Sequence, residues 1–196
     1  MSLCSYWVGN FIFDYLTYLL LALFAILMCF AFQIEDFIGE SDFVRALCAL
    51  FFIYGVANIL FTYVLSYLFD KSWNALIGIF FLNFMLGGIF TILIIILKIL
   101  NNNMTSNIAW FLRLFPAFSF GEGIINLGSR RYLEFYANTK LSTFSTEIVL
   151  YPIIYLVVTS IFYLLILIFI ENICSCLKKI LHSNSETEKE FEIKKR

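Results

Sequence analysis

Four long apolar stretches, separated by short polar segments, dominate the hydrophobic pattern of the chain. They lie at about residues 11–32, 43–69, 75–97 and 148–170. A helix needs about 20 mostly apolar residues to cross the hydrocarbon core of a bilayer, and each stretch has that length. The pattern therefore predicts an all-α fold, namely a polytopic membrane helix bundle with four transmembrane helices.

The segment at about residues 108–128 breaks this pattern. Its apolar runs are short, and they are interrupted by polar residues, by Pro116 and by several glycines. Non-helical backbone at membrane depth is tolerated only where protein or water surrounds it. We therefore expect a short broken helical pair before the last span that turns between Pro116 and Gly123, either re-entrant or at the interface. Close packing is the alternative explanation for its glycines.

The composition supports a location in the membrane. Of the 196 residues, 62% are hydrophobic and 14% are charged, and the mean hydropathy is +0.91. Soluble domains average about 45–50% apolar and about 25% charged residues. Thirteen basic residues against fourteen acidic ones leave a net charge of −1, so the chain has no basic field for nucleic acid. We expect membrane lipids around the chain and no nucleic-acid partner.

An even number of spans places both termini on the same side of the membrane. Residues 173–196 are rich in Lys and Arg, and the positive-inside rule puts this end in the cytoplasm. The acidic loop 33–42 and the polar stretch 101–107 then lie outside. Arg130, Arg131 and Lys140 would also be external, which weakens this orientation without reversing it.

Two segments carry possible modification sites. Asn103 begins the sequence Asn-Met-Thr, an N-glycosylation acceptor motif that also arises by chance. Cys174 and Cys176 lie where the last apolar stretch meets the basic tail, which suits palmitoylation. Two juxtamembrane thiols without a role remain the alternative.

Few residues could carry catalytic chemistry. The single histidine, His182, lies in the polar tail, so neither a zinc site nor His-based catalysis can be assembled. No phosphate-binding G-x-x-x-x-G-K-[ST] loop occurs. Asp14, Arg113 and Glu122 are the charges nearest the apolar regions and are candidates for function, although interface anchoring or an interhelical pair also explains them. We expect no catalytic, cofactor-binding or metal site in this chain.

Small and polar residues inside the apolar stretches predict helix–helix contacts. They are Gly55 and Asn58 in the second span, the Tyr63, Ser66 and Tyr67 face of the same span, and Asn83, Gly87 and Gly88 in the third. The glycine pair Gly87–Gly88 predicts either a close approach of two helices or a bend.

Four short motifs occur in order along the chain. They contain Trp7, Asn10 and Asp14 in YW-x-x-N-F-x-x-D; Gly55, Tyr63 and Phe69 in Y-G…Y-x-x-S-x-x-F; Asn83 and Gly87 in A…N-x-x-x-G; and Pro116, Gly121 and Gly123 in F-P-x-F-x-x-G-x-G. Together these motifs resemble the membrane domain of subfamily A ABC transporters, the lipid-exporting branch. The proline that is usual in the second motif is absent, because Asn58-Ile59-Leu60-Phe61 stands there. In the fourth motif Ile124 replaces a leucine.

The resemblance extends over about residues 5–172. It implies that residues 1–172 form part of an ABC transporter transmembrane domain, with short external helices before the last span. Residues 173–196 would be a cytoplasmic linker toward an ATP-binding domain that this stretch lacks. ATP and Mg would bind in that missing domain. The partners would be the remaining transmembrane spans and the nucleotide-binding domains of the same transporter.

Two functions follow from the sequence. The first is the membrane-spanning part of an ATP-driven transporter that moves lipids or other amphiphiles across or out of the bilayer. The alternative is a non-catalytic membrane scaffold or assembly subunit that binds another membrane protein. A membrane enzyme is disfavoured because the spans hold no histidine and no paired acids at hydrolytic spacing. We expect the chain to be no enzyme by itself.

Overall fold

Helices make up the regular structure in the described part of the chain. The computed structural model describes residues 3–69, 71–99, 105–130, 143–144 and 146–194. Its elements are α1 (Leu3–Ala31), α2 (Glu35–Ile38), α3 (Ser41–Ser66), α4 (Ser72–Phe84), the π-helical η1 (Met85–Phe90), α5 (Thr91–Ile99), α6 (Thr105–Leu112), α7 (Pro116–Gly128), the π-helical η2 (Thr146–Leu150) and α9 (Tyr151–Lys194). The predicted all-α fold is confirmed.

Four helices in the described residues are long and apolar enough to cross a membrane. They are Trp7–Ala31, Ser41–Ser66, Ser72–Leu97 and Ile148–Ile173. Each of them overlaps one of the predicted stretches. The third consists of α4, η1 and α5 in sequence, and the fourth joins the end of η2 to the first half of α9. The predicted bundle of four spans is therefore confirmed.

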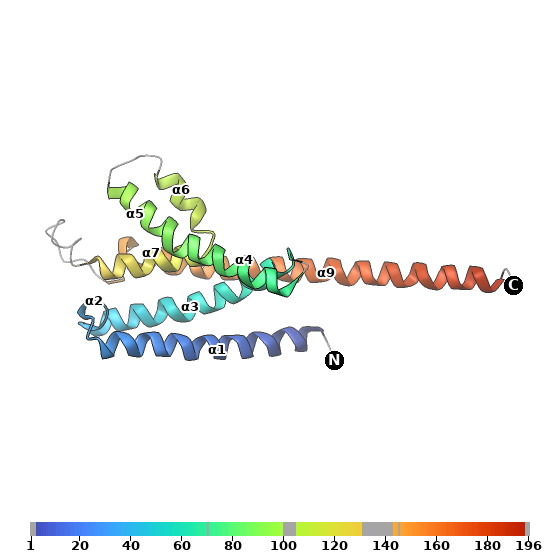
Figure 1. The fold of residues 1–196 in the computed structure, drawn as a ribbon, viewed down its shortest axis with the longest axis horizontal. Coiled ribbons are helices and arrows are strands. Elements are labelled where there is room, and N and C mark those ends of the chain that lie inside the picture. The colour runs from blue at the N-terminus through green and yellow to red at the C-terminus, as the bar shows by residue number, and fades with distance from the viewer. Residues whose placement is uncertain (1–2, 70, 100–104, 131–142, 145, 195–196) are drawn as a thin grey trace.

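The spans are arranged around α3 (Figure 1). α1 packs on one side of α3, and α7 and α9 pack on the other. The third span leans away from the bundle and carries α6 outward. The N-terminus, the connection between α3 and α4, and the projecting second half of α9 lie toward one end of the molecule, whereas α2 lies at the opposite end.

The main core lies between α3, α7 and α9. Leu47 and Leu50 of α3 pack there with Leu127 of α7 and with Ile148 and Leu156 of the last span. Lipid tails are as apolar as leucine, so van der Waals contact rather than exclusion from water holds such a core together in a membrane. The core therefore fixes α7 against two spans.

The first span is the least enclosed part of the bundle. Only 6% of the residues in its most apolar window are buried, against 33% in the second span. Large apolar side chains such as Phe13, Leu20 and Phe24 remain exposed on it. This face of α1 is therefore available to lipid or to further spans.

The third span changes its winding at the predicted glycine pair. The π-helical η1 contains Gly87 and Gly88, and the Thr91 hydroxyl donates a 2.9 Å hydrogen bond to the carbonyl oxygen of Leu86. Short π-helical insertions occur frequently at functional sites. The glycine pair thus marks a local change of helical geometry within an otherwise continuous span.

The predicted broken helical pair before the last span is confirmed, but its turn lies elsewhere. The turn occupies Arg113–Phe115, and α7 begins at Pro116. Proline suits a first helical position because its φ is already helical and its missing N–H has no intrahelical partner there. Gly121 and Gly123 lie inside α7, so the prediction of a turn between Pro116 and Gly123 is wrong.

Candidate functional site

The turn between α6 and α7 reaches deep into the bundle. The Tyr163 hydroxyl donates a 3.1 Å hydrogen bond to the carbonyl oxygen of Leu114, and Tyr163 lies more than halfway along the last span. The rings of Phe115 and Phe61 are 6.0 Å apart between centroids. The turn therefore lies beside the inner part of the last span, and we call α6, this turn and α7 the re-entrant pair.

A buried ion pair closes this re-entrant turn. The Arg113 guanidinium donates hydrogen bonds of 2.7 Å and 2.6 Å to the two carboxylate oxygens of Glu122. The side chains are only 19% and 7% exposed. The guanidinium also lies 5.3 Å from the centroid of the Tyr155 ring. The two charges therefore neutralise each other. An interhelical pair was one of the explanations that the sequence offered for these two residues.

The pair also keeps the arginine charged. Arg113 lies outside the four spans, and its hydrogen bonds to Glu122 raise the pKa of the guanidinium above its ordinary value. Burial acts in the opposite direction but is the smaller effect. A bidentate guanidinium–carboxylate pair combines charge with a fixed geometry. Its chemistry here is structural, because it joins the two arms of the re-entrant pair.

Glycines let α7 approach two spans closely. A methyl group at Gly121 would lie 2.6 Å from the carbonyl oxygen of Gly87 on η1, and a methyl group at Gly123 would lie 2.8 Å from Leu50 on α3. A methyl group at Gly87 would in turn lie 3.1 Å from the carbonyl oxygen of Ala117. Such contacts leave no room for a side chain, so these motif glycines serve close packing.

Three other motif residues meet at the end of the bundle where the N-terminus lies. The Tyr63 hydroxyl donates a hydrogen bond to the Asp14 carboxylate, which connects α3 to α1. Trp7 Nε1 donates a 2.6 Å hydrogen bond to Glu171 Oε1 on α9, and the rings of Trp7 and Tyr63 are 5.4 Å apart. The three side chains therefore tie three helices together.

The remaining predicted residues are dispersed. Gly55 lies against the Tyr18 ring, the Phe69 ring lies against Gly78, and Asn10 is half-buried on α1. Asn103 lies outside the described residues, as do the side chains of Cys174 and Cys176. Among the described side chains, no three His, Cys, Asp or Glu residues lie close enough to hold a metal ion.

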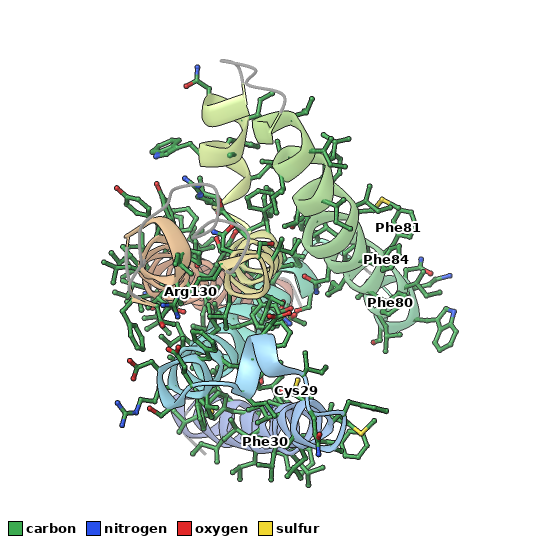
Figure 2. The ribbon with its side chains drawn as sticks, turned by 90° about the vertical axis from the view of Figure 1, so that its left-hand side faces the viewer. Cys29, Phe30, Phe80, Phe81, Phe84 and Arg130 are labelled. Carbon is green, nitrogen blue, oxygen red and sulfur yellow. The ribbon has the colours of Figure 1, made fainter. Side chains whose placement is uncertain are left out.

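An open groove runs along the third span. One hollow of about 690 Å³ lies between α3 and α4, and a second of about 340 Å³ lies between α3, η1 and α7. Asn83 lines both hollows, so they meet at this residue. On the other side of α4, Phe81 and Phe84 point away from the bundle (Figure 2). We call the two hollows together the α3–α4 groove.

A polar stripe on α3 forms one wall of this groove. Tyr54, Asn58, Thr62 and Ser66 follow one another at intervals of four residues, which places them on the same face of the helix. The opposite wall is mostly apolar, with Leu76 as an example. The groove therefore offers polar and apolar surface side by side along the length of a span.

Two residues that line the groove each carry a buried amide oxygen without a partner among the described residues. The Oδ1 atoms of Asn58 and Asn83 are buried, and neither accepts a hydrogen bond from any described residue. An unpaired buried acceptor costs about 1–3 kcal/mol. Both asparagines are among the residues predicted from the sequence to form helix–helix contacts, whereas the stripe as a unit was not predicted. The signal was the four-residue spacing that runs from Tyr54 to Ser66.

Comparison with known proteins gives a family for this arrangement. Residues 1–169 match the family model described as ABC-2 family transporter protein. The retinal-specific phospholipid-transporting ATPase ABCA4 of Homo sapiens is 30% identical over 143 residues, which are 70% of this chain and 6% of that protein. The ATP-binding cassette sub-family A member 13 of Homo sapiens is 29% identical over 130 residues, which are 62% of this chain and 3% of that protein. The chain thus spans less than a tenth of the length of these relatives.

Proposed function

Because the chain belongs to the ABC-2 family of transporter proteins, we propose that it forms the membrane-spanning part of an ATP-driven transporter that moves lipids or other amphiphiles. Its four apolar helices and its family make it a multi-pass integral membrane protein and a component of a transport system. One of its relatives bears the name phospholipid-transporting ATPase. We extend that activity to this chain as a hypothesis.

The α3–α4 groove is the observation that carries the proposal. An amphiphile has a polar head and an apolar tail, and the groove has a polar stripe facing an apolar wall. Ligand sites typically have volumes of about 300–1,000 Å³, the range in which both hollows fall. A headgroup could follow Asn58, Thr62 and Ser66 along α3 while its tail contacts the facing wall or the surrounding lipid.

The energy for movement would come from nucleotide-binding domains that act with this chain. We infer that the chain itself hydrolyses no ATP, because its sequence contains no phosphate-binding loop. The helix α9 continues from the last span to Lys194 and is the candidate connection toward such a domain. Both termini would then lie in the cytoplasm, and the loop at residues 33–42 would lie on the opposite side.

Lipid translocation tests the proposal directly. Proteoliposomes that contain the chain together with the ATP-binding domains of its transporter are expected to move a fluorescent phospholipid only when ATP is present. Thr62→Trp should block the groove and remove most of this translocation. Thr17→Trp is the matched control because Thr17 is exposed on α1, away from the groove. Equal translocation by Thr62→Trp and wild type would contradict the proposed path.

The exposed face of α1 favours a second function, a membrane scaffold or assembly subunit. This face leaves large apolar side chains uncovered, as expected for a surface that binds further spans. A scaffold would hold its membrane partner with no ATP-dependent lipid movement in the same proteoliposomes. That result would replace the transport proposal.

A further inference from the structure

We propose that the third span bends at η1, so that α4 moves against α3 and closes the α3–α4 groove. The inference rests on the proposed function, in which the groove is the path of an amphiphile, and it adds the device that opens and closes this path. It follows from where the third span is anchored, where its winding changes and which residues α4 turns toward α3.

One half of the third span is anchored in the bundle and the other half is not. Leu86, Thr91 and Ile94 of η1 and α5 are buried, and η1 meets α7 where their glycines approach closely. Among the side chains of α4, Ala75 alone is buried, and large apolar side chains such as Phe80 are exposed. The half that borders the larger hollow therefore has little packing to hold it in place.

The winding of the span changes at the boundary between these halves. The π-helical η1 runs from Met85 to Phe90 and directly follows α4. Sharp bends in helices occur at π-helical turns and at glycines. A methyl group at Gly88 would meet nothing within 4 Å, so no neighbouring atoms confine this side of the turn. The span can therefore change direction at η1 while its glycine contact with α7 stays in place.

The two helices present matched residues to each other across the groove. Lining residues repeat at intervals of four along each helix, namely Asn58, Thr62 and Ser66 on α3, and Ala75, Ile79 and Asn83 on α4. Because a short connection joins the end of α3 to the start of α4, the two stripes run in opposite directions. Ser66 then faces Ala75, and small residues allow helices to approach closely. At the other end of the stripes, one asparagine faces the other.

The two asparagines give the closed form a contact that the open form lacks. The Oδ1 atoms of Asn58 and Asn83 are buried and have no partner among the described residues, so a molecule in the groove does not reach them. Movement of the groove walls themselves can bring these oxygens a donor. An asparagine side chain has an acceptor oxygen and a donor NH₂ group, so two of them can pair. Pairing removes the penalty of unpaired buried acceptors and thereby stabilises the closed form.

Disulfide trapping of the closed form tests this proposal. Thr62→Cys and Ile79→Cys are introduced together in a background with the five native cysteines replaced, and the chain in nanodiscs is oxidised with copper phenanthroline. A disulfide needs two Cβ atoms about 4 Å apart, so it reports the meeting of the two walls. This pair should form a disulfide. Thr62→Cys combined with Phe81→Cys should not, because Phe81 points away from the bundle (Figure 2).

Variants at the hinge and at the amide pair show whether closure controls the rate of disulfide formation. Gly88→Ala should slow it about fivefold, because alanine holds a helical turn more firmly than glycine does. Gly9→Ala is the matched control, since a methyl group there also meets nothing within 4 Å but lies on α1. Asn83→Leu should also slow it about fivefold, the effect of one hydrogen bond. Equal rates in Gly88→Ala and Gly9→Ala would overturn the hinge, and an unchanged rate in Asn83→Leu would overturn the amide pairing.

A photoreactive phospholipid separates this inference from the proposed function. A diazirine-bearing phospholipid should label α3 and α4 peptides of the reduced cysteine pair, as identified by mass spectrometry, and the disulfide should remove most of this labelling. Undiminished labelling after oxidation, or failure of the facing pair to form a disulfide, would overturn closure while leaving the groove as a lipid path. Absence of labelling in the reduced chain would defeat the proposed path, whereas disulfide formation would still support closure. Unfolding of each variant in detergent is measured in parallel, so that slow disulfide formation is not mistaken for a loss of fold.

Discussion

The third span contacts the bundle in two different ways along its length. At η1 it crosses α7 at glycines, where backbone atoms approach so closely that a methyl group at Gly121 would lie 2.6 Å from Gly87 O. At α4 the same span faces a polar stripe of α3 across an open groove. The span is therefore in direct backbone contact with α7 at η1, where only the smaller hollow opens beside the crossing, whereas the larger hollow separates α4 from α3.

The difference shows how residue type decides which membrane interfaces close. Glycines allow two backbones to meet, and the resulting contact excludes other molecules. The groove instead combines asparagines, a threonine and bulky apolar side chains, which do not interlock across the gap. The closed crossing holds the re-entrant pair in place, and the groove remains available to a ligand. The predictions below test whether these two regions are as different as the structure indicates.

The largest effect should come from breaking the ion pair that holds the re-entrant turn beside the crossing. Arg113→Met leaves Glu122 as an unpaired buried charge, and it should lower the free energy of unfolding by about 3–5 kcal/mol. Detergent titration of the purified variants measures this change. The double variant Arg113→Met, Glu122→Met should recover most of the loss.

An exposed ion pair provides the matched control for this prediction. Arg45 and Asp42 are 3.3 Å apart, with side chains that are 73% and 54% exposed. Arg45→Met should change the free energy of unfolding by less than about 1 kcal/mol, because exposed pairs contribute little. Similar losses for Arg45→Met and Arg113→Met would show that burial of the Arg113–Glu122 pair does not determine its contribution to the free energy of unfolding.

A methyl group placed in the crossing should have the next largest effect. Gly121→Ala puts a side chain against the backbone oxygen of Gly87 and should destabilise the protein by about 1–3 kcal/mol, as overpacking does. Gly88→Ala is the control, because a methyl group there meets nothing within 4 Å. It should be neutral or stabilising by up to about 1 kcal/mol, since alanine favours a helix more than glycine does. Thermal unfolding in detergent distinguishes the two, and a tolerated Gly121→Ala would mean that the crossing is not closed.

Removing the hydroxyl that ties α1 to α3 should have a smaller effect and should leave the groove unaltered. Tyr63→Phe removes the donor to Asp14 and should destabilise the chain by about 0.5–1.5 kcal/mol, the range for a typical intramolecular hydrogen bond. Tyr151→Phe alters an exposed tyrosine on α9 and should have almost no effect. Lipid labelling of the groove should be the same in both variants. A change in groove labelling by Tyr63→Phe alone would show that this tie shapes the groove.

The smallest change in stability is expected inside the groove itself. Asn58→Leu removes an unpaired buried oxygen, so the free energy of unfolding should stay within about 1 kcal/mol of wild type or rise. Asn126→Leu is the contrasting variant, because the Asn126 side chain donates a 3.2 Å hydrogen bond to the carbonyl oxygen of Ile148. It should lower stability by about 1 kcal/mol. The same detergent titration compares them, and a clear loss for Asn58→Leu would indicate a structural partner for its oxygen.

The two regions also differ in how far the sequence predicts them. The length of the apolar stretches was enough to predict the four spans, and the interruption of residues 108–128 by polar residues, proline and glycines was enough to predict the broken helical pair. Both are local properties of the chain. The turn was misplaced because glycines permit both turns and close contacts, and only the approach of η1 to α7 decides between these roles. Arg113 and Glu122 were recognised as candidates, but their mutual pairing depends on how the chain folds back at Leu114.

The groove was the least predictable feature. A hollow depends on how far α4 leans from α3, which is a matter of tertiary packing and not of the local sequence. The polar spacing from Tyr54 to Ser66 is visible in the sequence and indicates a distinct face of the second span. Whether such a face packs against another helix or lines an opening is settled by tertiary structure alone.

Thiol reactivity at one position in each region tests the central claim most directly. Thr62→Cys places a thiol on the groove wall, and Thr91→Cys places one in the crossing, where Thr91 lies beside Gly121 and is 0% exposed. Both are made in a background with the five native cysteines replaced, reconstituted into membranes and treated with a lipid-soluble maleimide. The structure predicts rapid modification of Thr62→Cys and protection of Thr91→Cys. Equal rates at the two positions, or faster reaction at Thr91→Cys, would contradict the distinction between an open groove and a closed crossing.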